Sequence, residues 1–173
     1  MKHSREYILP IDGLSLGKHE YKFVLDRAFF AMFEYSEITN GNVEVDLLLH
    51  KQESMIELFF KISGELEVAC DRCADEFFEP VAGENELILK FGEAFVEETD
   101  EILIIPVEQH QFDISHLLYE YTILLLPLRK VHPEDANGNS TCNPEVIEKL
   151  NHMNHIESAD PRWEALRNLK SKN

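Results

Sequence analysis

The fold is decided by residues 56–73, IELFFKISGELEVACDRC, in which a long alternating run ends in two cysteines. Every even position from Ile56 to Cys70 is apolar or glycine, whereas Glu or Lys occupies four of the seven odd positions between them. This alternation is typical of a β-strand with one buried face, so Cys70 is predicted to be buried. Fifteen residues of strand span roughly 50 Å, longer than most strands, and we therefore expect a bulge or bend at Gly64.

The segments on both sides of this run predict further strands. They alternate in the same way or form short apolar runs, and they are residues 19–25, 43–49, 77–82, 87–91 and 102–107. Short polar connections, such as Gln52-Glu53-Ser54, join neighbouring strands as hairpins. The sequence therefore predicts an antiparallel β-meander, in which Pro106 places the last strand toward an edge of the sheet.

Residues 114–125 have the spacing of a helix that covers one sheet face. Their apolar side chains recur every three or four positions, and Pro127 follows closely enough to end the helix. We predict an α+β fold, an antiparallel β-meander sheet packed by one central amphipathic helix, with short helices at the C-terminus. Residues 1–143 are expected to form a single α+β domain with a cysteine knuckle, and residues 144–173 a helical, partly flexible tail.

The charge of the chain limits the partners that it can bind. The 173 residues carry 33 acidic and 16 basic side chains, a net charge of −17, and a surface of that sign repels phosphate backbones. Between Glu84 and Glu120 there are ten carboxylates and one cation, Lys90. This distribution favours an acidic body that meets a basic protein over a protein that coats RNA or DNA. The alternative is that the acidic surface only keeps the protein soluble.

Several observations predict a cytoplasmic location. The sequence contains no apolar run near the roughly 18 residues that a membrane helix needs, and its first residues lack the apolar core of a signal peptide. Three cysteines are an odd number, which argues against a framework of disulfides.

Two of the cysteines, Cys70 and Cys73, have CxxC spacing, which occurs in redox, metal-binding and purely structural sites. A redox site needs a helix after the cysteines to lower the thiol pKa, but here a strand is predicted to follow. Zinc needs four ligands, and the loop predicted to return near these cysteines offers His132 and Cys142 as the second pair. The third alternative is that Cys70 is buried as a small apolar residue and the other cysteines have no special role.

No catalytic arrangement stands out elsewhere in the chain. The other histidines lack a nearby nucleophile, and the seven glycines are dispersed, so that no phosphate-binding loop is formed. The residues indicate a binding module rather than an enzyme. A zinc-dependent or thiol-redox enzyme that uses the CxxC is the alternative, and an alkylation-reactive thiol would favour it.

The C-terminal segment is predicted to be a recognition helix. Asp160 can cap it, Pro161 suits its first position, and a helix of about three turns is only marginally stable alone. Its apolar stripe must therefore pack on a surface, either of this protein or of a partner. The residues expected to bind a partner are Arg162, Trp163, Leu166, Arg167 and Lys170.

Three ordered motifs carry a resemblance to a known family. The run Val68-Ala69-Cys70-Asp71-Arg72-Cys73, followed by Phe78 and Pro80, resembles the V-x-C-x-R-C hallmark of the bacterial YceD family, the large ribosomal RNA subunit accumulation proteins. Leu126-Pro127-Leu128 before a loop that ends in Cys142, and the segment from Asp160 to Lys170, are also similar. The chain departs from the family in having Ala74 where leucine is common and His132 where some members carry cysteine.

The resemblance implies a cytosolic, non-enzymatic factor needed for large-subunit ribosomal RNA to be made or to persist. The expected partner is the large ribosomal subunit precursor or a basic ribosomal protein, because complementary charge speeds encounter and selects partners. Direct contact with RNA is left open, and neither a membrane nor DNA is expected as a partner. Zn²⁺ is the one cofactor considered.

Overall fold

The computed structural model describes residues 6–154, which fall into two compact units. The first unit contains the described residues up to Ala69 together with Glu76–Lys130. The second unit contains the turn Cys70–Asp75 and the chain from Val131 onward. The predicted division into residues 1–143 and 144–173 stays a prediction.

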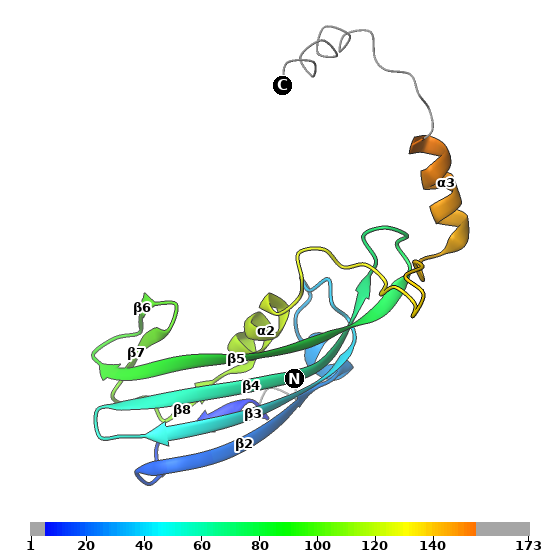
Figure 1. Ribbon diagram of the computed structural model, residues 1–173. Helices are drawn as coiled ribbons and strands as arrows, with labels where there is room; N and C mark the ends of the chain where they lie inside the picture. The colour runs from blue at the N-terminus through cyan, green and yellow to red at the C-terminus, as the bar shows by residue number, and fades with distance from the viewer. Residues whose placement is uncertain (1–5, 155–173) are drawn as a thin grey trace, which may run out of the picture. The chain divides into compact units, whose positions relative to one another are not determined.

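The first unit is built on a six-stranded sheet (Figure 1). Four long strands follow one another as antiparallel neighbours, which confirms the predicted meander, and a pair of shorter strands extends it beside the fourth. In spatial order the strands are β2 (Gly17–Leu25), β3 (Gly41–Lys51), β4 (Met55–Ala69), β5 (Glu76–Gly92), β7 (Ile102–Pro106) and β6 (Val96–Thr99).

Strand β7 differs from the others because it pairs with β5 in parallel. The chain first forms β6 and then turns back, so that β7 enters the sheet between β5 and β6. The prediction that Pro106 places this strand at an edge is therefore wrong. Pro106 is the last residue of β7, and Val107, directly after it, donates its N–H to the carbonyl of Gly92 at 3.1 Å. The missing N–H of proline is thus tolerated at the strand end.

The hairpin of β4 and β5 pairs continuously from Met55 with Lys90 to Ala69 with Glu76. A bulge or a bend was expected at Gly64. The register runs through this residue without a bulge. Figure 1 shows that the long strands curve along their length. Gly64 has a φ of 157°, and a Cβ placed there would overlap the backbone of Asn42 on β3. Only glycine allows β3 and β4 to come this close.

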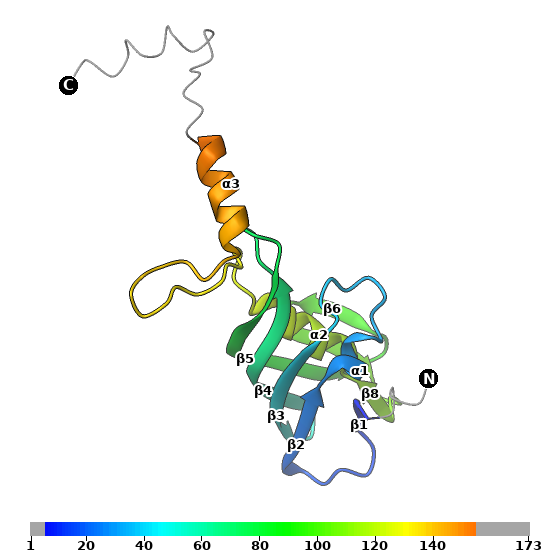
Figure 2. The same cartoon turned by 90° about the vertical axis from the view of Figure 1, so that its right-hand side faces the viewer.

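One face of the sheet carries the core. Helices α1 (Arg27–Phe30) and α2 (Ser115–Leu124) pack on it, together with the small pair β1 (Ile8–Pro10) and β8 (Gln111–Asp113) (Figure 2). The ring of Tyr121 on α2 meets that of Phe60 on β4 at a centroid distance of 5.3 Å. The α+β class and the central helix are confirmed, with α2 shorter than the predicted 114–125 by one residue at each end.

The second unit consists of the cysteine turn, a loop and helix α3 (Pro144–Asn154). Asn143 starts this helix, since its side-chain oxygen accepts the N–H of Glu145 at 3.1 Å and its carbonyl accepts that of Ile147 at 3.1 Å. Among the described residues, no helix is both long and apolar enough to span a membrane. The predicted recognition helix and its five partner-binding residues, Arg162 to Lys170, lie outside the described residues.

Candidate metal centre

The cysteine turn is held by backbone hydrogen bonds at both of its ends. Cys70 donates its N–H to the carbonyl of Asp75 at 2.9 Å, and Ala74 donates to the carbonyl of Cys70 at 2.9 Å. Ala74 has a φ of 63°, the left-handed conformation that residues with a Cβ rarely adopt. The turn thereby brings Cys70 and Cys73 onto the same side of the chain.

The loop after Val131 is folded back on itself by one carboxylate. Asp135 accepts the N–H groups of Asn137 and Asn139, each at 2.8 Å, and donates its own N–H to the carbonyl of Asn139 at 2.8 Å. The hydrogen bonds from Asn139 and then Asn137 hold the pKa of Asp135 below its usual value. This tight turn brings together the two ends of the loop, where His132 and Cys142 lie.

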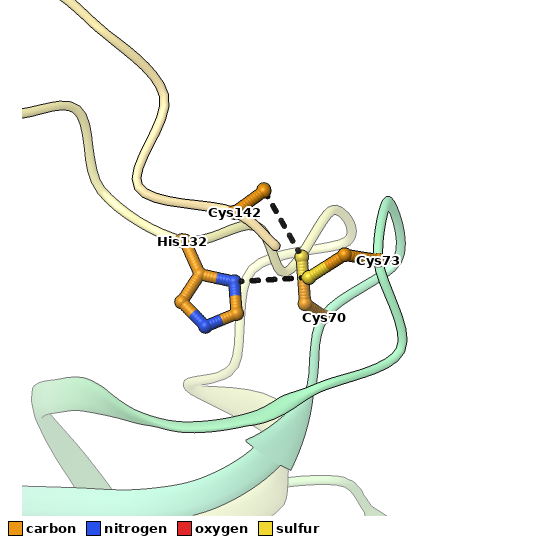
Figure 3. Close-up of side chains that lie close together, drawn as sticks. All are labelled: Cys70, Cys73, His132 and Cys142. Atoms are coloured by element: carbon orange, nitrogen blue, oxygen red, sulfur yellow. Dashed lines mark hydrogen bonds between the residues drawn. The ribbon is translucent and has the colours of Figure 1, made fainter. Parts of the chain in front are cut away.

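The four residues predicted as zinc ligands meet in the second unit. Their ligand atoms all lie within 4.8 Å of one another, and Figure 3 shows the four side chains converging. The Sγ atoms of Cys70 and Cys142 are 3.8 Å apart, and the Sγ of Cys73 is 3.5 Å from Nδ1 of His132. The four residues chosen from the sequence are therefore close together in the structure, although His132 is 59 positions from Cys73 along the chain.

The two shortest contacts in this cluster have the lengths expected in a tetrahedral zinc site. With Zn–S bonds of about 2.3 Å and Zn–N bonds of about 2.0–2.1 Å, tetrahedral ligands lie about 3.8 Å apart for two sulfurs and about 3.5 Å apart for sulfur and nitrogen. The pair of Cys70 and Cys142 and the pair of Cys73 and His132 match these two values. By contrast, a disulfide would need its sulfurs at about 2.05 Å, and all three cysteines are free.

Backbone N–H groups prepare Cys70 to bind a cation as a thiolate. Burial raises the pKa of Cys70, but the N–H groups of Arg72, Cys73 and His132 outweigh it and lower the pKa to about 6. The first of these hydrogen bonds, from Arg72 to the sulfur, measures 3.4 Å. For Cys73 burial prevails and raises the pKa, although the N–H groups of Asn143 and Asp75 act in the opposite direction. A bound metal would have to displace the proton of Cys73.

The three cysteines are enclosed in the structure. Cys70, Cys73 and Cys142 are 3%, 6% and 5% exposed, which confirms the predicted burial of Cys70. Redox-active and nucleophilic cysteines are partly accessible and commonly precede a helix, whereas β5 follows here. Four protein ligands also leave no open position on a tetrahedral metal, which is the arrangement of a structural rather than a catalytic site.

Two polar contacts around the site were not predicted from the sequence. The guanidinium of Arg72 donates to the hydroxyl of Ser140 at 3.2 Å, and the side-chain amide of Asn143 donates to the carboxylate of Asp75 at 3.2 Å. Both contacts join the cysteine turn to the loop. Asn143 could have been found, because an asparagine directly before a proline is a helix-start signal, but no local pattern indicates the partner of Arg72.

A comparison with protein families gave a match to one family. The model described as "Large ribosomal RNA subunit accumulation protein YceD" matches residues 58–170, which include all four candidate ligands and the C-terminal motif. Comparison with curated proteins and with solved structures gave no match. Because the matched region covers more than half of the chain and carries the V-x-C-x-R-C motif, the chain belongs to the YceD family, whose name assigns it a role in the accumulation of large-subunit ribosomal RNA.

Proposed function

We propose that this protein supports the accumulation of large-subunit ribosomal RNA as a non-enzymatic binding protein in the cytoplasm. Its direct partner is a basic ribosomal protein or the precursor of the large subunit. The observation that carries this proposal is the distribution of charge on the first unit.

All ten carboxylates between residues 84 and 120 are exposed, whereas the single cation in that segment is already neutralised. That cation, Lys90, forms an ion pair with Glu98 at 2.8 Å. The ten carboxylates belong to Glu84, Glu86, Glu93, Glu97, Glu98, Asp100, Glu101, Glu108, Asp113 and Glu120. This part of the surface is therefore almost purely anionic, as the sequence predicted.

A surface of this kind selects its partner by charge. Phosphate groups are repelled by it, so bare ribosomal RNA is a poor ligand for the first unit. Ribosomal proteins rich in lysine and arginine are attracted, and the attraction raises the rate of encounter more than it raises the final affinity. The protein would hold such a partner soluble or deliver it to the assembling subunit.

We further propose that Cys70, Cys73, His132 and Cys142 bind one Zn²⁺ with a structural role. The described part of the second unit buries no side chains other than those of its three cysteines, so it has no apolar core of its own. When a site forms only in the folded state, the free energy of metal binding becomes free energy of folding. Zinc would thus supply the stability that apolar packing supplies elsewhere.

The C-terminal segment is proposed as a second partner contact. Its cations are the complement of the acidic first unit and are suited to phosphate or to an acidic groove on the pre-ribosome. The residues concerned are Arg162, Trp163, Leu166, Arg167 and Lys170.

The test is to purify the tagged protein from its own cells at two salt concentrations and identify the proteins and RNA that accompany it. We expect basic large-subunit proteins at low salt, retained after ribonuclease treatment and lost at high salt, because the contact is electrostatic. A chain that ends at Ala159 should retain less of the large-subunit precursor.

A matched pair of variants separates the acidic surface from net charge alone. Glu97→Gln with Glu101→Gln should reduce the recovered partner more than Glu34→Gln with Glu37→Gln, since all four residues are exposed and both pairs remove two charges. Recovery of no large-subunit component by the wild-type protein would contradict the proposed function.

A further inference from the structure

The face of the sheet opposite the core carries a distinctive row of side chains. Cross-strand partners on β2, β3, β4 and β5 form a line that reads Glu20, Leu48, Phe59 and Glu86. Two apolar side chains thus lie side by side in the middle of the sheet, with a carboxylate at each end of the row. Both apolar side chains are half-buried.

The next row along the strands is fully charged. It reads Lys22, Asp46, Lys61 and Glu84 in the same strand order, and its charges sum to zero. Lys22 is held by Asp46 at 2.8 Å, so this cation is compensated within the row. The two rows together therefore keep the net charge of −2 that comes from Glu20 and Glu86.

These two rows line a groove of about 460 Å³. The groove is large enough for several side chains, and its floor is formed by Leu48 and Phe59. Helices α1 and α2 pack on the other face of the sheet, the face that carries Phe60, so neither helix covers this face (Figure 2). An apolar floor rimmed by charge is typical of a binding surface rather than of solvent-exposed sheet.

The apolar floor continues across the sheet toward β7. Ile88 on β5 pairs with Ile102 on β7, and Lys90 pairs with Ile104, so that further half-buried isoleucines lie on the same face. The stripe runs from the groove to β7, and the neighbouring strand β6 carries the exposed Glu97 and Glu98. A ligand lying along it would meet the apolar side chains of the stripe, with Glu57 on β4 beside Ile88 and Lys90 on β5 beside Ile104.

We propose that this groove binds a lysine- and arginine-rich segment of a partner protein that carries one large apolar side chain. The apolar side chain would pack on Leu48 and Phe59, while flanking cations would pair with Glu20 and Glu86. This inference rests on the proposed function and names the surface on which the basic partner is held.

Charge favours a basic segment over two other possible occupants, which are nucleic acid and a second copy of this chain. Nucleic acid would bring phosphates against a rim with net negative charge, which is unfavourable. A second copy of this chain would place two grooves of the same negative sign against each other. A basic segment gains from both features of the groove, because its cations match the rim and its apolar side chain matches the floor.

The probe is a fluorescently labelled 12-residue peptide of alternating lysine and arginine with one central phenylalanine. The control peptide has alanine in place of the phenylalanine. Binding to the full-length protein is measured by anisotropy at low and at physiological salt. Burial of the phenylalanine should make the first peptide bind about tenfold more tightly than the second. Glu20→Gln with Glu86→Gln should weaken both peptides by about tenfold at low salt.

The double variant Leu48→Thr with Phe59→Thr provides the decisive comparison. Threonine keeps a high strand propensity, and circular dichroism checks that the sheet is intact. In this variant the two peptides should bind equally, because the floor that distinguishes them is gone. If the variant does not fold, the Glu20→Gln and Glu86→Gln variant, compared with Glu34→Gln and Glu37→Gln outside the groove, still decides the question.

Three outcomes would overturn the proposal. The first is an equal loss of peptide binding in the groove and control charge variants, and the second is an unchanged preference for phenylalanine in the threonine variant. The third is a dimer in sedimentation experiments that dissociates in the threonine variant, which would make a second copy the occupant. If the wild type recovers its large-subunit partner and the groove variants recover it equally well, the groove proposal alone fails. If the wild type recovers none, the proposed function fails as well.

Discussion

The two units of this protein differ in the side chains that they bury. The first unit buries a continuous apolar core that runs from Tyr7 to Tyr121 and draws on every strand of the long meander. In the described part of the second unit, the buried side chains are Cys70, Cys73 and Cys142 alone. One unit is held by many weak apolar contacts, and the other places three sulfurs and one ring nitrogen around a single point.

The comparison shows why a CxxC turn can be necessary in a protein that already has a good core. A segment too small to bury enough apolar surface needs a disulfide, a metal or a partner to stay folded. The three cysteines are free, and the 3.8 Å between the sulfurs of Cys70 and Cys142 fits two ligands of one metal better than a disulfide. The two units should therefore respond separately to changes that affect a metal or a core.

The largest effect is expected from Cys73→Ser, which removes one ligand. Zinc content should fall from about one equivalent to below about a tenth, and the second unit should become sensitive to protease, because structural zinc supplies on the order of 10 kcal/mol. The first unit should keep its melting transition. Elemental analysis and limited proteolysis measure both effects, with Ala69→Ser, at an exposed neighbouring position, as the control. Wild-type protein that contains no zinc and is indifferent to a chelator would refute the metal centre.

Gly64→Ala should destabilise the first unit and leave the second unit unchanged. A Cβ at this residue overlaps the backbone of Asn42, and the φ of 157° is unfavourable for alanine, so the first unit should lose at least about 3 kcal/mol of unfolding free energy. Zinc content should not change. Gly13→Ala, which has a φ of 82° but open space around it, should cost only about 1 kcal/mol in urea unfolding. Equal costs for the two substitutions would mean that the close approach of β3 and β4 is not what requires glycine.

Alkaline pH should weaken the first unit. Burial raises the pKa of Tyr7 to about 12, with Glu6 and Asp26 adding to the effect, and its hydroxyl donates to the carbonyl of Val24 at 3.3 Å. Because this folded pKa lies above the ordinary value of 10.0, the stabilisation is present below pH 10 and is lost as the pH rises through 12. All five tyrosines lie in the first unit. Tyr7→Phe should therefore flatten the loss of stability between pH 10 and 12 in urea unfolding, and an unchanged slope would exclude this residue as its cause.

The smallest effect should be a gain in zinc affinity, caused by Ala74→Gly in the cysteine turn. A residue with a Cβ in the left-handed conformation costs about 1 kcal/mol relative to glycine, and Ala74 has a φ of 63°. The substitution should therefore tighten zinc binding by about fivefold and leave the melting temperature of the first unit unchanged. Competition with a colourimetric chelator measures the affinity. Weaker binding in the glycine variant would show that Ala74 contributes more through its methyl group than it costs in strain.

The parts of the structure that were predictable are those with a local pattern. The alternation from Ile56 to Cys70 predicted β4 to within one residue at each end, and the helical spacing around Leu118 predicted α2. The proximity of the four candidate ligands was predictable because the loop contains few residues that can bind a metal. In contrast, the parallel entry of β7 beside β5 depends on pairing between strands, and an apolar run of five residues gives no sign of its direction.

The groove on the open face escaped sequence analysis for a related reason. Leu48 and Phe59 interrupt the polar side of their strands, but each looks like an isolated exposed apolar residue when its strand is considered alone. Only the register of the hairpin sets them side by side, between Glu20 and Glu86. The same limit applies to Gly64, whose role depends on the distance between two strands.

The spacing of the metal ligands along the chain has a consequence for biosynthesis. Cys70 and Cys142 are 72 residues apart, so an unfolded chain that captured zinc with both would first have to close a long loop. All the strands of the sheet precede the second half of the ligand set in the order of synthesis. A nascent chain therefore completes its sheet before it can complete the four-residue cluster, so the Zn²⁺ binding that we propose would be the last step of maturation. On this proposal, a cell that is short of zinc would accumulate a folded sheet without a finished second unit.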